Sequence, residues 1–148
     1  MEIESDFVNG AKIHREFTVD GENVNPEIRI SRIPENSRSL VLIVDDPDAP
    51  AGTWVHWVLF NIPVTGDLVI ISKNSTPRGA KQGTNSWSII GYRGPSPPKG
   101  SGSHRYFFKV FALDCIFDLP KGSGLFDVEQ AMEGHIISKG QLFGVYNR

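Results

Sequence analysis

The chain has 148 residues, of which 39% are hydrophobic and 22% are charged, and its formal net charge is −2 at pH 7. This length and composition predict a single globular domain, residues 1–148, with one substantial core. The near-neutral charge excludes the basic field of a nucleic-acid-binding protein, and no apolar run approaches the roughly 20 residues that insert into a bilayer.

The cysteine count and the N-terminus predict the cellular compartment. Cys115 is the only cysteine, so no internal disulfide forms, which fits a reducing environment. The first six residues, MEIESD, are acidic and lack the basic and apolar regions of a signal peptide. We therefore expect a cytoplasmic protein.

Short apolar runs separated by 15 glycines and 10 prolines predict a mainly β fold with many turns. The run Leu40–Val44 is apolar at every position, so we expect that strand to be covered on both faces. In chain order, the strands are predicted at Ile3–Val8, Glu16–Val19, Glu27–Arg32, Ser39–Val44, Trp54–Ile62, Leu68–Ile71, Ser103–Leu113 and Gln141–Tyr146.

One helix is predicted near the C-terminal end of the chain. Asp127 is the expected N-cap, and Gln130 completes the spacing of a capping box. Gly140 is the expected helix end. Between them, helical spacing predicts a core-facing stripe of Val128, Ala131, Met132, His135 and Ile136.

The sequence DDPDAP at residues 45–50 is the most informative segment, because it places three carboxylates and two prolines directly after a buried strand. A carboxylate leaving a buried strand is costly unless it finds a hydrogen-bond partner or a positive charge. The proline rings stiffen the segment. It therefore indicates a rigid wall of a site, although these residues taken alone also fit an ordinary Asx-rich turn.

Alternation along two other strands brings further polar residues to strand ends. Trp54 and His56 share one face of their strand, as do His104 and Tyr106 of theirs. A lone histidine on an apolar strand is more often a core residue, but two at matching strand ends with aspartates nearby favour a site. If the strands are neighbours, one small cavity beside Trp54 is ringed by Asp46, Asp48, His56, His104 and Tyr106.

The segment 73–102 contains six glycines and four prolines and shows little periodicity. An ordered loop of this length is more often functional than not. Its proline cluster, Pro95–Pro98, taken alone fits a rigid loop or a polyproline segment that binds a protein partner.

These motifs resemble the phosphatidylethanolamine-binding protein family. They come in the family's order and approximate spacing and cover nearly the whole chain: DPDAP at 46–50, WVHW at 54–57, GPSPPKG at 94–100 and HRY at 104–106. The C-terminal sequences AMEGH at 131–135 and GVY at 144–146 resemble the prokaryotic Raf-kinase-inhibitor-like branch.

The resemblance implies an antiparallel β-sandwich, with a large sheet packed on a small one, Greek-key connections and one or two short helices. It also implies a pocket for phosphate-bearing head groups or other small anions. A homodimer is implied too, with Trp87 and Phe126 as candidate interface aromatics. The pocket residues that it implies are Asp46, Trp54, His56, Pro98, His104 and Tyr106, with Asp48 beside them.

We expect a non-enzymatic binding protein without a cofactor or a metal. No serine lies in a nucleophile elbow, and Cys115 has no evident basic partner that would lower its pKa. Since ionised aspartates repel phosphate, anion binding is expected to need at least one protonated histidine. Two alternatives stay open: an inhibitor of a serine protease or kinase that acts through the pocket rim and proline loop, and a metal-dependent hydrolase using the histidines and aspartates.

Overall fold

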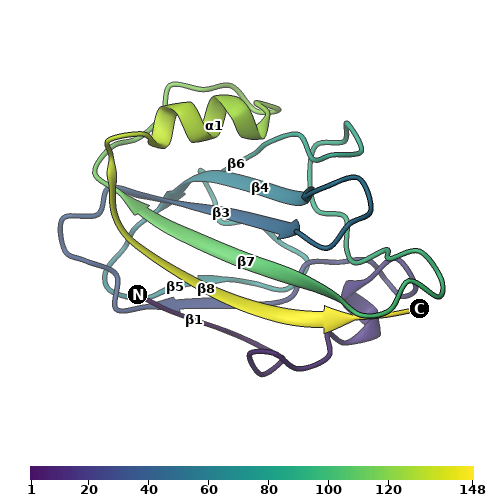
Figure 1. The fold of residues 1–148 in the computed structure, drawn as a ribbon. Helices are drawn as coiled ribbons and strands as arrows, with labels where there is room; N and C mark the ends of the chain where they lie inside the picture. Colours follow the sequence, from purple (N-terminus) through teal and green to yellow (C-terminus); the bar gives the residue numbers. More distant parts are fainter.

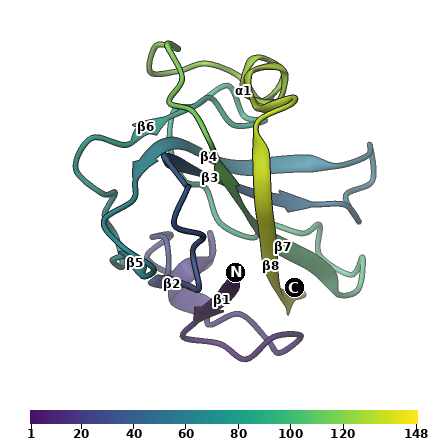
Figure 2. The ribbon, with the colours of Figure 1, turned by 90° about the vertical axis from the view of Figure 1, so that its left-hand side faces the viewer.

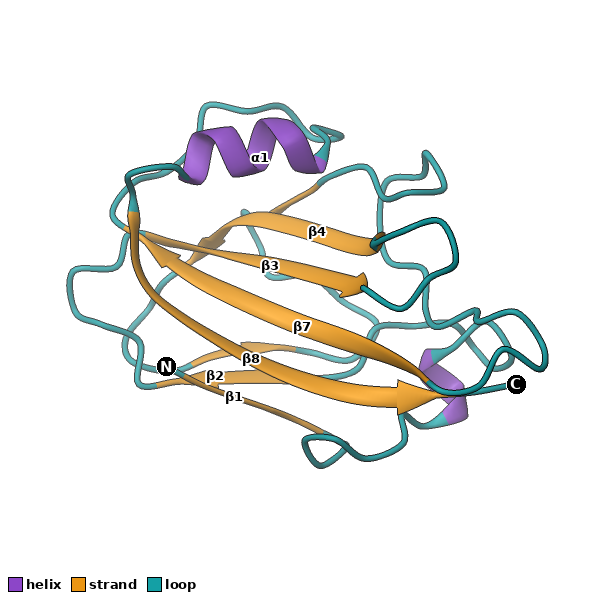
Figure 3. Ribbon diagram, viewed as in Figure 1, coloured by secondary structure: helices purple, strands orange, loops and turns teal.

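The computed structural model describes all residues, Met1–Arg148, as two antiparallel sheets with a helix packed on the outside of the larger one (Figures 1 and 3). The small sheet has the order β1-β2-β5, and the large sheet has the order β6-β4-β3-β7-β8. The elements are β1 (Glu2–Ser5), the 3₁₀ helix η1 (Arg15–Phe17), β2 (Ile28–Ser31), β3 (Ser39–Asp46), β4 (Trp54–Pro63), β5 (Val69–Ile71), β6 (Lys81–Gln82), β7 (His104–Leu113), α1 (Leu125–Met132) and β8 (Ile136–Tyr146).

The large sheet is the middle layer, between the small sheet and α1 (Figure 2). Twenty-one buried hydrophobic residues fill the space between the sheets, and nine more lie between the large sheet and α1. All eight residues of β3 are buried. Leu40 and Leu42 face the first core, while Val41 and Ile43 face the second, so the prediction that this strand is covered on both faces is confirmed.

The topology confirms the predicted antiparallel β-sandwich. In the large sheet, β3, β4, β6 and β7 lie in the spatial order β7-β3-β4-β6, which is the order of a Greek key. Every strand pair in both sheets is antiparallel. Seven of the eight predicted strands are present, with ends that shift by a few residues.

The predicted strand at Glu16–Val19 is wrong, because this stretch forms η1 and a turn. The backbone N–H groups of Phe17 and Thr18 donate to the carbonyls three residues earlier, at His14 and Arg15. The Thr18 hydroxyl donates to the same Arg15 carbonyl and accepts from the backbone N–H of Asp20. These local bonds satisfy the backbone without a neighbouring strand.

Helix α1 begins earlier than predicted, with Gly124 rather than Asp127 at the N-cap. Asp127 lies instead in the first helical turn, where its negative charge interacts favourably with the helix dipole. Val128 and Met132 are buried, as the helical spacing predicted. At eight residues, α1 is also far too short to cross a membrane, and no other helix comes closer.

The predicted C-terminal part of the helix is wrong because Gly134 ends it early. This residue has φ of +81°, in the left-handed region that terminates helices and that glycine adopts without strain. His135 and Ile136 therefore leave the core: 47% of the His135 side chain is exposed, and Ile136 is 46% exposed at the start of β8. Gly140, the predicted helix end, lies within β8.

Gly144 lets the N-terminal segment pack directly behind one wall of the site described below. It pairs in register with Tyr106 across β7 and β8. A Cβ atom at this position would collide with the Ile13 side chain and approach Phe7 Cε2 to 2.9 Å. Both neighbours are core residues that cannot move aside freely.

We therefore predict that Gly144→Ala lowers the free energy of unfolding by about 1–3 kcal/mol. The matched control is Gly124→Ala at the N-cap of α1, where an added Cβ meets nothing within 4 Å and φ is −77°. It should cost less than about 1 kcal/mol. Urea unfolding of the three proteins measures both values, and equal losses would contradict the collision.

Candidate functional site

Three strand ends converge at one end of the large sheet (Figure 3). Strand β3 ends at Asp46, β4 begins at Trp54 and β7 begins at His104. Because β3 lies between the other two and runs antiparallel to both, its last residue meets their first residues. The sequence predicted that these polar residues meet if the three strands are neighbours. The structure shows that the strands are neighbours.

A cavity of about 320 Å³ opens between these strand ends and the loops around them. Six of the seven predicted site residues line it, and Asp48 does not. Its walls are formed by Asp46, Trp54, His56, Pro98, His104 and Tyr106, together with Ala49, Pro50, Ala51, Trp87, Ser96 and Pro97.

A buried carboxylate–histidine pair forms the floor of the site. Asp46 Oδ2 lies 2.8 Å from His104 Nδ1, and only 5% of each side chain is exposed. The other oxygen, Oδ1, accepts a 2.8 Å hydrogen bond from the backbone N–H of Asp48. Asp46 is therefore partnered at both oxygens, and it holds the His104 ring in place.

The second nitrogen of His104 extends this pair into the proline loop. Its Nε2 lies 3.1 Å from the Ser101 hydroxyl, which itself donates to the Pro98 carbonyl at 2.6 Å. Since the only hydroxyl proton of Ser101 is used on Pro98, the hydroxyl oxygen accepts from His104 Nε2–H. His104 thus contacts the Asp46 carboxylate through Nδ1 and the proline loop through Nε2.

This arrangement has the residue order of a catalytic triad, Ser101–His104–Asp46, but the protons run in the opposite direction. In a triad the histidine accepts the serine proton as a base. Here His104 donates to the serine, which in turn holds Pro98. The hydrogen-bond chain therefore fixes the proline loop against the start of β7.

His56 is the second histidine of the cavity and is almost fully buried, with 2% exposure. Burial lowers its pKa from the usual 6.5, although the Arg93 carbonyl and the charge of Asp46 oppose this shift. Its Nδ1 lies 2.7 Å from the Arg93 carbonyl, so in the neutral ring Nδ1 donates and Nε2 is left as an acceptor.

Tyr106 carries the one polar atom of the cavity walls that is buried and unsatisfied. The side chain is 1% exposed, and its hydroxyl makes no hydrogen bond of normal geometry within the protein, although the Asp46 carboxylate and the Ser96 backbone lie near it. Burial, followed by the nearby negative charge of Asp46, raises the tyrosine pKa above its usual 10, so the group stays a neutral O–H donor. An unpartnered buried hydroxyl is costly, so this donor calls for a ligand or a water molecule.

Asp48, the seventh predicted residue, points away from the cavity. Its carboxylate receives three bonds of 2.8–2.9 Å from Arg105, two from the guanidinium and one from the backbone N–H. These contacts lower the Asp48 pKa from 3.8 to about 2. The residue therefore anchors the DPDAP segment to the start of β7 from outside.

Trp87 is the most important wall residue that the sequence reasoning missed as part of the site. Its ring packs edge-on against Trp54 and His56, with centroids 5.6 and 4.8 Å away, and the Arg93 guanidinium carbon lies 4.9 Å from its centre. Asn85 Oδ1 holds the turn by accepting from the backbone N–H of Trp87. A tryptophan within the glycine-rich segment 73–102 was the available signal.

Phe126, the other predicted interface aromatic, is 73% exposed on α1, and the homodimer stays a prediction.

Comparison with sequence-family models gives a match to "Phosphatidylethanolamine-binding protein" over residues 3–147. A UPF0098 protein of Methanothermobacter thermautotrophicus is 45% identical over 145 residues, covering 96% of this chain and 95% of that protein. A UPF0098 protein of Pyrococcus abyssi is also 45% identical, over 152 residues, and the alignment covers all of this chain and 85% of that one.

Two crystal structures from bacteria have the same fold. A putative phosphatidylethanolamine-binding protein homologue from Chlamydia trachomatis superposes with a TM-score of 0.91 at 33% identity, covering 99% of this chain and 97% of the other. YbcL from E. coli, described as a new member of the mammalian PEBP family, has a TM-score of 0.90 at 27% identity and covers 99% and 98%.

We predict that Asp46→Ala costs about 3–5 kcal/mol of unfolding free energy, because it leaves His104 and the Asp48 amide without acceptors in a buried place. Asp48→Ala is a matched control two residues away. It removes a partly exposed pair with Arg105 and should cost about 1 kcal/mol or less. Denaturant unfolding compares the two; a larger loss for Asp48→Ala would contradict the assignment of Asp46 as the buried anchor.

We also predict that the buried His56 makes the protein less stable as the pH falls below about 6.5. In the unfolded chain this histidine takes up a proton near its ordinary pKa, whereas in the folded protein its lowered pKa delays uptake. The unfolded state then binds more protons, so stability falls with pH at up to about 1.4 kcal/mol per unit until the folded pKa is reached.

The unfolding free energy of wild type and His56→Gln, measured from pH 7.5 to about 5, isolates this contribution. The wild-type curve should fall more steeply than that of the variant. His14→Gln, which removes an exposed histidine, should follow the wild type. If the unfolding free energies of wild type and His56→Gln change equally with pH, His56 has the same pKa in the folded and unfolded states, and the prediction is wrong.

Proposed function

The chain belongs to the phosphatidylethanolamine-binding protein family, and from this premise we propose that its cavity binds a small anionic ligand, such as a phosphate-bearing head group, without catalysing a reaction. The observation that carries the proposal is the buried Tyr106 hydroxyl, a donor that lacks a partner and lies in the cavity wall. An anionic oxygen would satisfy it.

The charges of the cavity are compatible with an anion. Asp46 is the only carboxylate in the lining, and its two oxygens are engaged by His104 Nδ1 at 2.8 Å and by the Asp48 backbone N–H at 2.8 Å. The Arg93 guanidinium stands behind Trp87 and adds positive potential. The engaged carboxylate and the nearby guanidinium weaken the main objection to an anion site lined by aspartate.

Two further polar groups, on Tyr106 and His56, favour a particular form of the ligand. The Tyr106 hydroxyl offers a donor, while neutral His56 offers Nε2 as an acceptor. A ligand that carries both an acceptor oxygen and an O–H or N–H donor would pair with both groups. A monoprotonated phosphate has this pattern. When His56 is protonated, Nε2 becomes a second donor, and a fully ionised group fits instead.

The size and walls of the cavity favour a head group rather than a large molecule. Its volume of about 320 Å³ lies at the lower end of the range for ligand pockets. Trp54, Trp87 and Pro98 supply apolar walls for the rest of the head group.

The non-enzymatic part of the proposal is supported by the Ser101 hydroxyl, which donates its proton to the Pro98 carbonyl and not to a base. Inhibition of a protease or kinase stays a prediction from the sequence.

We predict that Tyr106→Phe weakens the binding of inorganic phosphate about 10-fold, since one hydrogen bond to a charged group is worth roughly 1.5 kcal/mol or more. The variant should unfold at about the same denaturant concentration as wild type, because the removed hydroxyl has no partner in the free protein. NMR titration at pH 6 measures the dissociation constants.

Tyr92→Phe is the matched control, because it should change stability and not phosphate binding. The Tyr92 hydroxyl donates to the Phe17 carbonyl at 2.6 Å and does not line the cavity. Its removal should lower stability by about 1 kcal/mol and leave phosphate binding unchanged. If Tyr106→Phe binds phosphate as tightly as wild type, the proposed ligand contact is wrong.

A further inference from the structure

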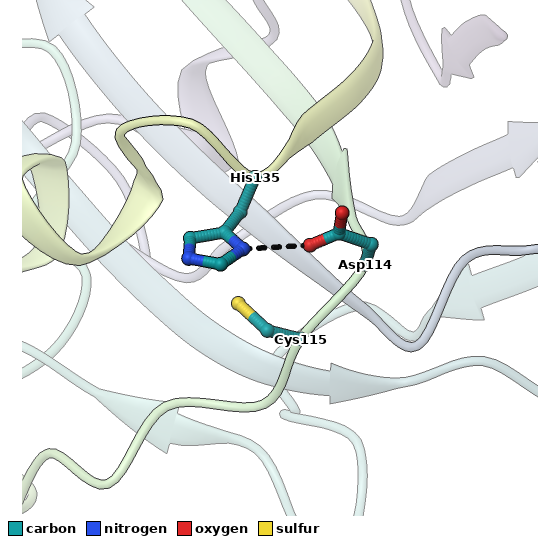
Figure 4. Close-up of side chains that lie close together, drawn as sticks. All are labelled: Asp114, Cys115 and His135. Carbon is teal, nitrogen blue, oxygen red and sulfur yellow. Dashed lines mark hydrogen bonds and ion pairs between the residues drawn. The ribbon is translucent and has the colours of Figure 1, made fainter.

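A second group of chemically active side chains lies at the opposite end of β7 from the cavity. Asp114 and Cys115 follow the last residue of this strand, and His135 directly precedes β8 (Figure 4). One potential ligand atom from each of the three lies within 4.8 Å of the others. His135 Nδ1 and Asp114 Oδ1 are 2.7 Å apart (Figure 4).

Three hydrogen bonds to the backbone of these residues hold the group in place. The Asp114 amide donates to the His135 carbonyl at 3.1 Å, and the His135 amide donates to the Met132 carbonyl at 3.0 Å. The Ser39 hydroxyl donates to the Cys115 carbonyl at 2.6 Å. Two segments that are 20 residues apart in sequence are thus fixed beside each other before any ligand arrives, which reduces the entropy cost of binding.

The group is separate from the cavity. Strand β7 runs from His104 to Leu113, directly before Asp114, and at roughly 3.3 Å per residue its ten residues span about 30 Å. None of the three residues lines the cavity. The group is therefore a site distinct from the cavity.

We propose that Asp114, Cys115 and His135 form a zinc-binding site with three protein ligands and an open position. Thiolate, imidazole and carboxylate are the three protein donors that zinc takes, and three of them with a water molecule in the fourth position complete a tetrahedron. About half of the Asp114 and His135 side chains is exposed, at 47% each, so the open position faces solvent.

The three side chains need only a small adjustment to hold the ion. With metal distances of roughly 2.0–2.3 Å, ligand atoms in a tetrahedral site lie about 3.3–3.7 Å apart. The Asp114–His135 contact must therefore open from 2.7 Å, and the widest separation must shrink from at most 4.8 Å. Both exposed side chains can turn at their χ angles, while Cys115 rests against the core below α1.

The same three residue types also occur in cysteine hydrolases, but this geometry does not favour a nucleophile. The thiol makes no hydrogen bond to the His135 ring, whose Nδ1 is engaged by Asp114. Burial, followed by the charge of Asp114, raises the pKa of Cys115, which keeps the thiol protonated in the free protein. A cation placed among the three groups would replace the thiol proton and offset the carboxylate.

The test is a zinc titration of reduced, tag-free protein at pH 7.5, monitored by calorimetry, with cobalt as a spectroscopic probe. We expect one zinc per chain with a dissociation constant of roughly 10 μM or tighter. We also expect a thiolate charge-transfer band in the near ultraviolet when cobalt is bound. Cys115→Ser and His135→Gln should each weaken zinc binding at least about 10-fold, the loss that even an outer hydrogen-bond partner of a metal commonly causes.

Two control variants locate the ion. His14→Gln removes an exposed histidine elsewhere, and His56→Gln removes a histidine of the cavity; both should bind zinc like wild type. Circular dichroism confirms that each variant is folded. The proposal is overturned if zinc binds only above about 1 mM, if Cys115→Ser binds as tightly as wild type, or if His56→Gln alone abolishes binding.

Discussion

The burial of the Asp46 carboxylate is the constraint on which the rest of the site depends. Strand β3 is buried along its whole length, so the charge at its end has no access to bulk water and must be partnered by the protein. His104 provides the hydrogen-bond partner, and its other nitrogen reaches through Ser101 to the Pro98 carbonyl. One electrostatic requirement therefore links two strand ends and fixes the proline loop that closes the cavity.

The two histidines of the cavity differ because their partners differ. His104 faces a carboxylate and a hydroxyl oxygen, while His56 faces a carbonyl and aromatic rings, and burial lowers the pKa of His56. Tyr106 adds an unsatisfied buried hydroxyl to the same cavity wall. The polar groups of the cavity therefore differ in both their partners and their burial.

The sequence predicted the helix ends wrongly because two possible start signals and two possible stop signals lie close together in the chain. Asp127 and Gln130 have the spacing of a capping box, but the helix begins earlier, and the left-handed Gly134 ends it before the predicted stripe is complete. As a result His135 was expected in the core, and its approach to Asp114 and Cys115 could not be anticipated. The strands were predicted more reliably, because alternation and continuous apolar runs depend on which faces are buried.

The sequence by itself determined the mainly β architecture, the double-sided burial of β3 and the faces that carry His56, His104 and Tyr106, since each follows from residue order along a single strand. Only the tertiary structure decided which histidine pairs with Asp46, that Asp48 turns outward to Arg105, and that Trp87 completes the wall. The physical reason is separation along the chain. Asp46 and His104 are 58 residues apart, and contacts at such distances depend on strand order, register and loop path, which no local pattern encodes.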